Sequence, residues 1–310
     1  MRRLPSFPHR NSQSKEHTTG TAAHDPHAEH TGHTGHTDHT DHTDHTAQDR
    51  HAGHDPHAGH DPHAGHDMSA TFGLAQTEDG YRIGEVSAPG SANEPGTLSF
   101  TISGPDGDAV TDFTEEHEKK LHLIVARSDG AHFHHVHPTM DAGGTWSVPW
   151  QWDAPGSYRA FADFIPTATG AGLTLSSTVE VAAETPGELA LHPATPRTET
   201  SVGGYDVTVS GSITPNHGSE LQFTVSRDGE PVTALEPYLG AFGHLVALRD
   251  GDLAYLHVHP HGDAPQPGAT SGPHITFEIT APTPGRYLLF LDFQVAGEVF
   301  TAPLVVDTVG

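Results

Sequence analysis

The sequence contains no cysteine. This absence excludes disulfides, thiolate metal sites, iron–sulfur clusters and a cysteine nucleophile. Long hydrophobic runs are missing as well, because no stretch approaches the roughly 18 apolar residues of a membrane-spanning helix. Arg2 and Arg3 resemble the start of a secretory signal, but no apolar segment follows them. We therefore expect no membrane span and no signal peptide, and a cytoplasmic chain as written.

Basic residues are scarce. The chain has 14 Lys and Arg against 40 Asp and Glu, which gives a formal net charge of −26. A surface of this sign repels nucleic acid and anionic lipid and attracts cations. We expect no nucleic-acid partner, and metal ions are the partners that such a surface favours.

Histidine is the abundant residue that stands out, with 29 copies. Near the N-terminus it recurs at every third position with one skipped slot, separated by Thr, Gly, Asp, Ala and Pro. Such spacers cannot bury a core, so we expect residues 1–69 to be disordered without metal. We call this segment the histidine tract; its periodic members are His24, His27, His30, His33, His36, His39, His42, His45, His51, His54, His57, His60, His63 and His66.

The period of three decides how the tract binds metal. In an extended polyproline II chain, successive histidines would lie about 9 Å apart. Metal–nitrogen bonds of about 2 Å cannot join neighbours at that spacing, so the chain must bend around each ion. Gly and Asp-Pro spacers permit such bends. The tract is therefore predicted to bind several ions loosely, in many near-equivalent arrangements.

The remainder of the chain contains an internal duplication. GYRIGEV, LHLIVARSDGAHFHHVHP and APGSYRAFADF recur in the same order as GYDVTVSG, GHLVALRDGDLAYLHVHP and TPGRYLLFLDF. About seven short strands with Gly, Pro and Asp turns fit each copy. This pattern predicts an all-β protein with two tandem immunoglobulin-like or cupredoxin-like β-sandwiches, at residues 70–188 and 196–310.

One hairpin in the first copy carries a candidate metal site. If Asp129-Gly130 forms a two-residue turn, paired positions sum to 259 and His122 lies opposite His137, with His135 two residues along on the same face. His132 and His134 would then lie on the other face. Three imidazoles on one face at this spacing are predicted to converge on one ion.

The second copy repeats the set as His244, His257 and His259. Its Asp250-Gly251 turn lies one residue earlier relative to the histidines, so the same reasoning pairs His244 with His257. A buried cluster of His–Asp hydrogen bonds is the alternative interpretation of both sets.

Asp163 and Asp292 lie in matching late strands, FADF and FLDF. A carboxylate among apolar residues is costly unless it is paired, so each is a possible fourth ligand or a hydrogen-bond partner of a ligand. Three histidines and one carboxylate suit copper or zinc, with nickel as a further option. The absence of cysteine excludes a blue-copper electron-transfer site.

The segments LHLIVARSDGAHFHHVHP, YRAFADF, LEPYLGAFGHLVALRDGDLAYLHVHP and RYLLFLDF resemble a family of two-domain actinobacterial proteins labelled as secreted or heavy-metal-associated. The resemblance covers about residues 75–308. It implies a sandwich fold, a link to metal homeostasis and an extracytoplasmic location. The family usually begins with a hydrophobic segment, which this chain lacks.

These features favour a metal-binding protein that sequesters, buffers or delivers ions, and not an enzyme. His135, His137 and Asp141 faintly resemble a cupin oxygenase motif, but cupins place their third histidine downstream. A cupin-like metalloenzyme is therefore one alternative, and a β-sandwich interaction module with structural histidines is another.

Overall fold

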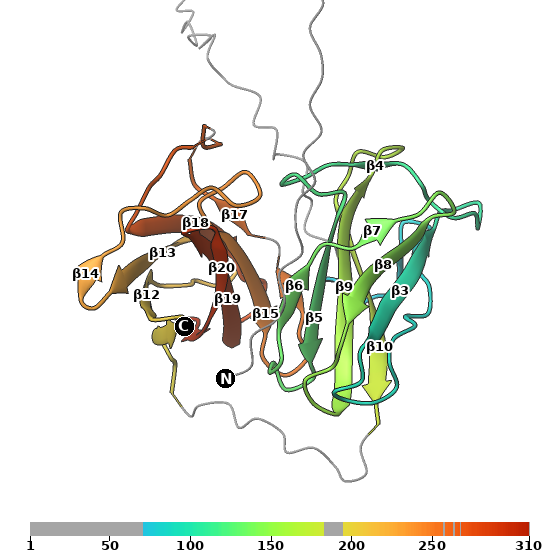
Figure 1. Ribbon diagram of the computed structural model, residues 1–310, viewed down its shortest axis with the longest axis horizontal. Coiled ribbons are helices and arrows are strands. Elements are labelled where there is room, and N and C mark those ends of the chain that lie inside the picture. The colour runs from blue at the N-terminus through green and yellow to red at the C-terminus, as the bar shows by residue number, and fades with distance from the viewer. Residues whose placement is uncertain (1–70, 183–194, 257, 263, 267, 310) are drawn as a thin grey trace, which may run out of the picture. The chain divides into compact units, whose positions relative to one another are not determined.

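The computed structural model describes residues 71–182, 195–256, 258–262, 264–266 and 268–309. These residues form strands, turns and irregular segments without an α-helix, in two tandem all-β repeats (Figure 1). The prediction of an all-β protein with two tandem domains is thus confirmed. The predicted histidine tract lies outside the described residues.

The first repeat consists of two antiparallel sheets. One has the strand order β1-β2-β3-β8-β7 and the other β10-β9-β5-β6, with β4 beside β9. The strands are β1 (Thr77–Glu78), β2 (Tyr81–Ile83), β3 (Gly96–Ser103), β4 (Phe113–Thr114), β5 (Leu121–Arg127), β6 (His134–Val136), β7 (Thr139–Met140), β8 (Thr145–Trp150), β9 (Gly156–Pro166) and β10 (Leu173–Val181).

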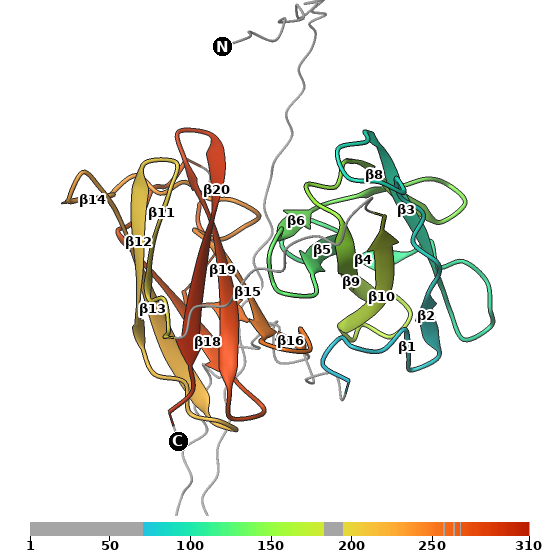
Figure 2. The same ribbon diagram turned by 90° about the horizontal axis from the view of Figure 1, so that it is seen from below.

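The second repeat has the same topology. Its sheets follow the orders β11-β12-β13-β18-β17, with β14 beside β13, and β16-β15-β19-β20. Figure 2 shows these two layers of strands edge-on. The strands are β11 (Glu199–Val202), β12 (Tyr205–Gly211), β13 (Gly218–Arg227), β14 (Glu230–Pro231), β15 (His244–Arg249), β16 (Tyr255–Leu256), β17 (His259–Pro260), β18 (His274–Thr280), β19 (Arg286–Val295) and β20 (Glu298–Asp307).

Each repeat has its own hydrophobic core between its two sheets. On β3, Leu98, Phe100 and Ile102 alternate with more exposed residues, as a strand with one buried face requires. They pack with Trp146 and Trp152 in the first core. Phe223, Phe277 and Phe293 play the same part in the second core.

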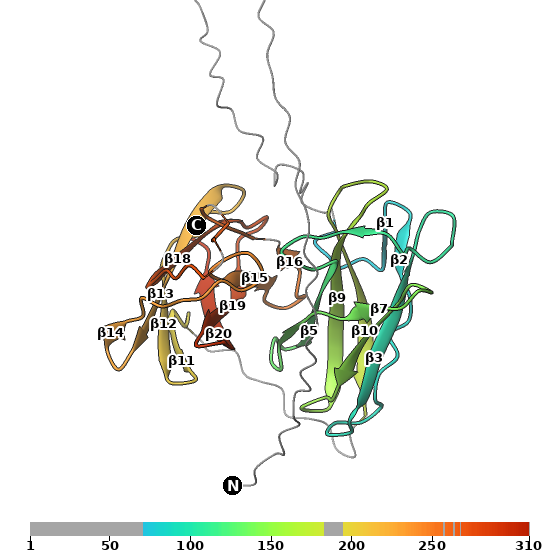
Figure 3. The same cartoon turned by 45° about the horizontal axis from the view of Figure 1, so that its top comes forward.

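Strands β5 and β15 are buried on both faces. All seven residues of β5 are buried, and β9 beside it is buried over most of its length (Figure 3). Leu121, Leu123 and Val125 of β5 enter the core of the first repeat. Ile124 and Ala126 instead join a third cluster with Val246 and Leu248 of β15. Both repeats belong to one compact unit. Burial of both faces explains why these strands are almost continuously apolar in sequence.

Matching residues from the two repeats meet in this third cluster. Phe133 stacks on Phe290 with ring centroids 3.8 Å apart, and Tyr255 lies 5.7 Å from Phe161. Phe133 corresponds to Tyr255 in the repeated sequence, and Phe161 corresponds to Phe290. Each hairpin therefore places one aromatic ring against the other repeat. His122, Asp163, His244 and Asp292 occupy the same sheet faces as this cluster.

Among the described residues, none forms a helix that is long and apolar enough to cross a membrane.

Candidate metal centre

Three histidines of the first repeat converge at the β5–β6 hairpin. His122 Nδ1 lies 3.0 Å from His135 Nε2 and 3.2 Å from His137 Nε2. The ligand atoms of the three side chains all lie within 4.8 Å of one another. Tetrahedral ligands at metal–nitrogen bonds of 2.0–2.1 Å are about 3.3 Å apart. Two of the three separations are close to that value, and the group could hold one ion; we call the three imidazoles the triad.

The strand register places these residues. Ile124 pairs with His135 and Val125 with His134, so paired positions sum to 259 as predicted. The turn itself differs from the prediction. Gly130 N donates to Arg127 O and Arg127 N donates to Ala131 O, which makes a three-residue loop with Gly130 at a φ of 76°. His132, at a φ of 50°, then adds a bulge that restores the predicted register.

Hydrogen bonds fix the tautomer of two triad members. His122 Nε2 lies 3.2 Å from the Glu116 carbonyl oxygen, which can only accept, so Nε2 carries the proton. His135 Nδ1 likewise donates to Asp292 at 2.7 Å. In the neutral rings, His122 Nδ1 and His135 Nε2 therefore both present lone pairs. Two lone pairs at 3.0 Å repel each other unless a cation lies between them.

Burial lowers the pKa values of His122 and His137 and so disfavours a proton on either ring. Loss of solvation, together with the nearby His135, lowers the pKa of His122 to about 4. Loss of solvation, then the charges of His135 and His122, lowers the pKa of His137 to about 2. Both rings are therefore neutral near pH 7, with nitrogens free to bind a metal ion.

The two aspartates lie directly across the sheet from the two strand histidines. Asp163 pairs with His122 and Asp292 with His244 in the strand registers. Asp163 accepts hydrogen bonds from Thr174 Oγ1 at 3.0 Å and Tyr255 OH at 2.9 Å. Asp292 accepts from Thr301 as well as from His135. Neither belongs to the group of described residues whose ligand atoms converge, and Asp292 holds a triad ligand through its hydrogen bond.

In the second repeat, the predicted pairing of His244 with His257 is wrong. Ala247 pairs with Leu256 and Leu248 with Tyr255, so paired positions sum to 503, whereas the predicted pairing requires a sum of 501. The cause is a four-residue loop, Asp250 to Leu253, closed by Arg249 N donating to Ala254 O. His259 pairs with Glu278 of the other sheet. His257 and the side chain of His259 lie outside the described part of the chain.

His244 nevertheless repeats the environment of His122. Its Nε2 donates to the Tyr238 carbonyl at 2.9 Å, and Tyr238 precedes His244 by six residues, as Glu116 precedes His122. Burial, then the charge of His117, lowers the pKa of His244 to about 3. His244 is thus a neutral, buried ring with its Nδ1 available, as a member of a second triad would be.

Sequence reasoning missed His117. Its ring lies 4.8 Å from the His244 ring and 6.2 Å from the His122 ring. It sits in a two-residue turn closed by hydrogen bonds between Glu116 and Lys119, at a φ of 49°, and its counterpart Leu239 has a φ of 54°. Because the histidine is present in one copy only, neither the duplication nor a strand period points to it.

The remaining histidines of the first hairpin face away from the triad, as the alternation of the strand predicts. His134 Nε2 lies 2.9 Å from an Asp153 carboxylate oxygen, and His132 Nδ1 lies 3.7 Å from the same oxygen. Both are partly exposed, and Asp153 is more so. His132 and His134 are therefore suitable control positions when the triad histidines are substituted.

Fold and site together define a tandem all-β protein with a buried histidine cluster. The chain belongs to the family of the domain of unknown function DUF8832, whose model matches residues 75–183 and again 200–310. No curated protein matches the chain.

Solved structures with some similarity include Salmonella alpha-2-macroglobulin (mutant Y1175G), with 13% identity, TM-score 0.26, and 76% of this chain and 15% of that chain covered. The Yersinia pseudotuberculosis adhesin InvE shows 12% identity and TM-score 0.22, with 73% and 58% covered. A membrane-anchored protein from Corynebacterium diphtheriae shows 10% identity and TM-score 0.23, with 75% and 59% covered. The chain thus spans less than two thirds of each of these three.

Proposed function

We propose that this protein binds a transition-metal ion at His122, His135 and His137, and that it sequesters, buffers or delivers such ions. The observation that carries the proposal is the pair of facing lone pairs on His122 and His135, fixed by Glu116 and Asp292. A structural His–Asp cluster would need a proton between the two facing nitrogens, and burial lowers the pKa of His122, one of the two rings, to about 4.

The nature of the ligands bears on the metal. Three neutral imidazoles suit Cu(II), Zn(II) and Ni(II), and the general affinity order places Cu(II) highest. Copper or zinc is our proposed ion, with nickel as a further option. A fourth position is left for water or a ligand that exchanges, which suits an ion that is passed on.

The size of the site favours binding over catalysis. The cavity beside the triad has a volume of about 30 Å³ and is lined by His117, His122, His135 and His244 among others. That is space for about one water molecule, whereas pockets for organic ligands are typically some 300–1,000 Å³. A cupin-like enzyme would need space for its substrate beside the metal, and this cavity is too small for an organic molecule.

The experiment compares a triple variant and a double variant of the same hairpin. The starting protein is a full-length chain whose fourteen periodic tract histidines are replaced by serine, which we call the tract-silenced chain. H122Q/H135Q/H137Q removes the triad, and H132Q/H134Q is the matched control because it alters the opposite face. Cu(II) and Zn(II) binding is measured by titration against a competing chelator, beside a thermal unfolding curve.

We expect the triad variant to lose one tight site and the control to keep it. Unchanged metal binding together with a large loss of stability in the triad variant would show that the three histidines are structural, and would overturn the proposal.

A further inference from the structure

His122 and the side chain of His135 are buried and His137 is partly buried, so a metal ion needs a route to the ligand atoms of the triad. His122 is 7% exposed, and the side chains of His135 and Asp292 are 5% and 4% exposed. The 30 Å³ cavity touches the triad through His122 and His135. Its other walls include His117 and Pro260, and these two residues also line a much larger groove.

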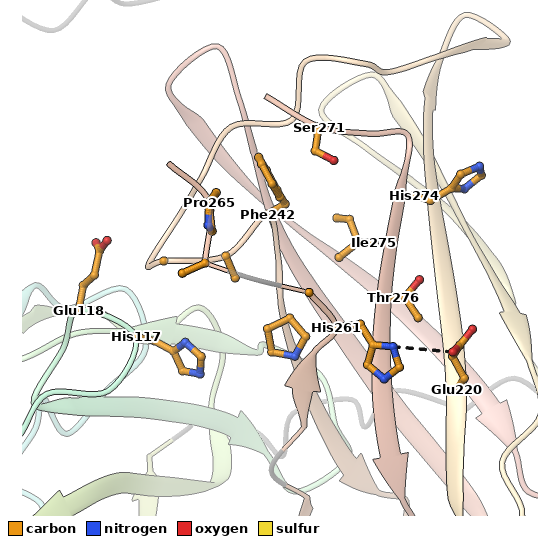
Figure 4. Close-up of a pocket in the computed structure, with 15 residues that line it drawn as sticks. His117, Glu118, Glu220, Phe242, His261, Pro265, Ser271, His274, Ile275 and Thr276 are labelled. Carbon is orange, nitrogen blue, oxygen red and sulfur yellow. Dashed lines mark ion pairs between the residues drawn. The ribbon is translucent and has the colours of Figure 1, made fainter. Parts of the chain in front are cut away.

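That groove has a volume of about 690 Å³ and carries several side chains that bind cations (Figure 4). His117 and Glu118 come from the first repeat, and Glu220, His261 and His274 come from the second. Apolar residues such as Phe242 and Ile275 complete the walls. The groove therefore combines imidazole and carboxylate groups, and it shares two wall residues, His117 and Pro260, with the triad cavity.

Negative charge is concentrated at the wall that contains Glu220, because Glu278 lies beside this lining residue. Glu220 and Glu278 are directly paired on β13 and β18, where like charges oppose each other. His261 lies between them, with Nδ1 3.7 Å from Glu220 and Nε2 3.7 Å from Glu278. All three side chains are well exposed. A hydrated cation approaching this wall is attracted by both carboxylates and meets an imidazole that can replace its water.

We propose that this groove is the entrance through which a divalent transition-metal ion reaches the triad, and that His117 passes the ion from the groove to the buried cavity. The inference rests on the proposed function. Its structural basis is that His117 lines both spaces, with its ring 6.2 Å from the His122 ring. His117 is thus a positioning residue for transfer and not a member of the triad.

A transfer residue leaves a specific kinetic signature. If His117 contacts the ion only in transit, its loss raises the barrier for entry and for exit equally. The association and dissociation rate constants then fall together while Kd stays constant. A residue that binds the ion in its final position would instead change Kd. A residue with a purely structural role would alter unfolding before it altered rates.

The test uses H117N in the tract-silenced chain, because asparagine tolerates a positive φ. Stopped-flow mixing with Cu(II) or Zn(II) gives the association rate constant, and release to excess chelator gives the dissociation rate constant. H217N is the matched control, since His217 is exposed and its imidazole donates to the nearby Pro215 carbonyl, away from the triad. We expect H117N to slow both rates by about tenfold or more, which corresponds to about 1.4 kcal/mol on the barrier.

A second pair of variants tests the charged wall. E220Q/E278Q should lower the association rate constant and weaken its dependence on salt, whereas E199Q, an exposed charge removed elsewhere on β11, should change neither. Unchanged rates in both H117N and E220Q/E278Q, with metal still bound, would overturn the entrance while leaving the triad in place. A weaker Kd at an unchanged association rate in H117N would make His117 a ligand and overturn its transfer role. Loss of one tight site in H122Q/H135Q/H137Q identifies the triad independently of these rates.

Discussion

Asp292 of the second repeat accepts a hydrogen bond from His135 of the first, at 2.7 Å. The two residues are 157 positions apart in the chain. The bond holds the His135 ring in one orientation and directs its Nε2 toward His122. The proposed site of the first repeat therefore depends on a carboxylate from the second.

Asp292→Asn should weaken metal binding in the tract-silenced chain by about 10- to 100-fold, as is typical when the hydrogen-bond partner of a metal-binding histidine is changed. The amide carries no charge, so it makes the His135 ring a poorer donor to the metal. Competition titration with a chelator measures the change. Asp153→Asn is the matched control, because it alters an exposed His–Asp pair at His134. Equal affinities for the two variants would mean that Asp292 has no part in the site.

Metal release should occur in two steps as pH falls. Protons compete for tract histidines near their reference pKa of about 6.5. Burial lowers the pKa of His122 to about 4 and that of His137 to about 2, so protons compete for the triad only at lower pH. Metal content of the full chain, measured against pH, should show an early loss at about pH 6–6.5 and a later one. The tract-silenced chain should show only the later step; an early loss there would contradict the assignment.

The metal-free fold should lose stability on acidification for the same reason. His122 and His244 bind protons in the unfolded chain at about pH 6.5, but in the folded chain only near pH 4 and 3. The unfolded state thus takes up more protons below pH 6.5, and the free energy of unfolding falls from there to about pH 4. Denaturant unfolding at pH 7.5, 6 and 5 measures this slope. H122Q/H244Q should flatten it, and an unchanged slope would assign it to other groups.

Local pattern predicted the register of the first hairpin correctly, although not its turn, because strand alternation depends on nearby residues. His122, His135 and His137 share a face because paired positions sum to 259. The type of turn does not matter as long as this register is kept. The second hairpin shows the limit of that reasoning. Its Asp-Gly pair lies inside a four-residue loop that includes Leu253 at a positive φ, so the predicted register is two residues off.

Contacts between the repeats were beyond sequence reasoning. Asp163 and Asp292 were expected to lie in a core strand and to need a partner, which is correct as far as burial goes. Their faces, however, turn toward the third cluster, and Tyr255 and His135 reach them from the opposite repeat. No periodicity within one repeat encodes a partner in the other. The pairing of Phe133 with Phe290 and Tyr255 with Phe161 is likewise visible only in the fold.

Deletion of residues 1–69 should remove most bound ions and leave the fold intact. The tract holds fourteen periodic histidines, whereas every core cluster consists of residues from Tyr81 onward. Metal per chain by mass spectrometry and thermal unfolding without metal, compared for both lengths, test this. A much lower melting temperature for the shortened chain would assign a structural role to the tract.

The second repeat should hold a site of its own. His244 has the same backbone hydrogen bond as His122 and a lowered pKa, which leaves its Nδ1 available to an ion. In the tract-silenced chain, H257A/H259A should abolish one tight site, because a single remaining histidine cannot hold an ion against water and buffer. The triad should keep the other site, so a titration with Cu(II) or Zn(II) should fall from two equivalents to one.

The matched control is H132A/H134A, which removes two histidines from the other hairpin and should leave both equivalents. A denaturation curve recorded beside each titration separates a lost ligand from a lost hydrogen bond. If His257 and His259 are parts of a buried hydrogen-bond cluster, their removal should cost about 1–3 kcal/mol for each partner left unsatisfied. That cost, together with an unchanged number of bound ions, would contradict a metal site in the second repeat and would restrict metal binding in the folded part of the chain to His122, His135 and His137.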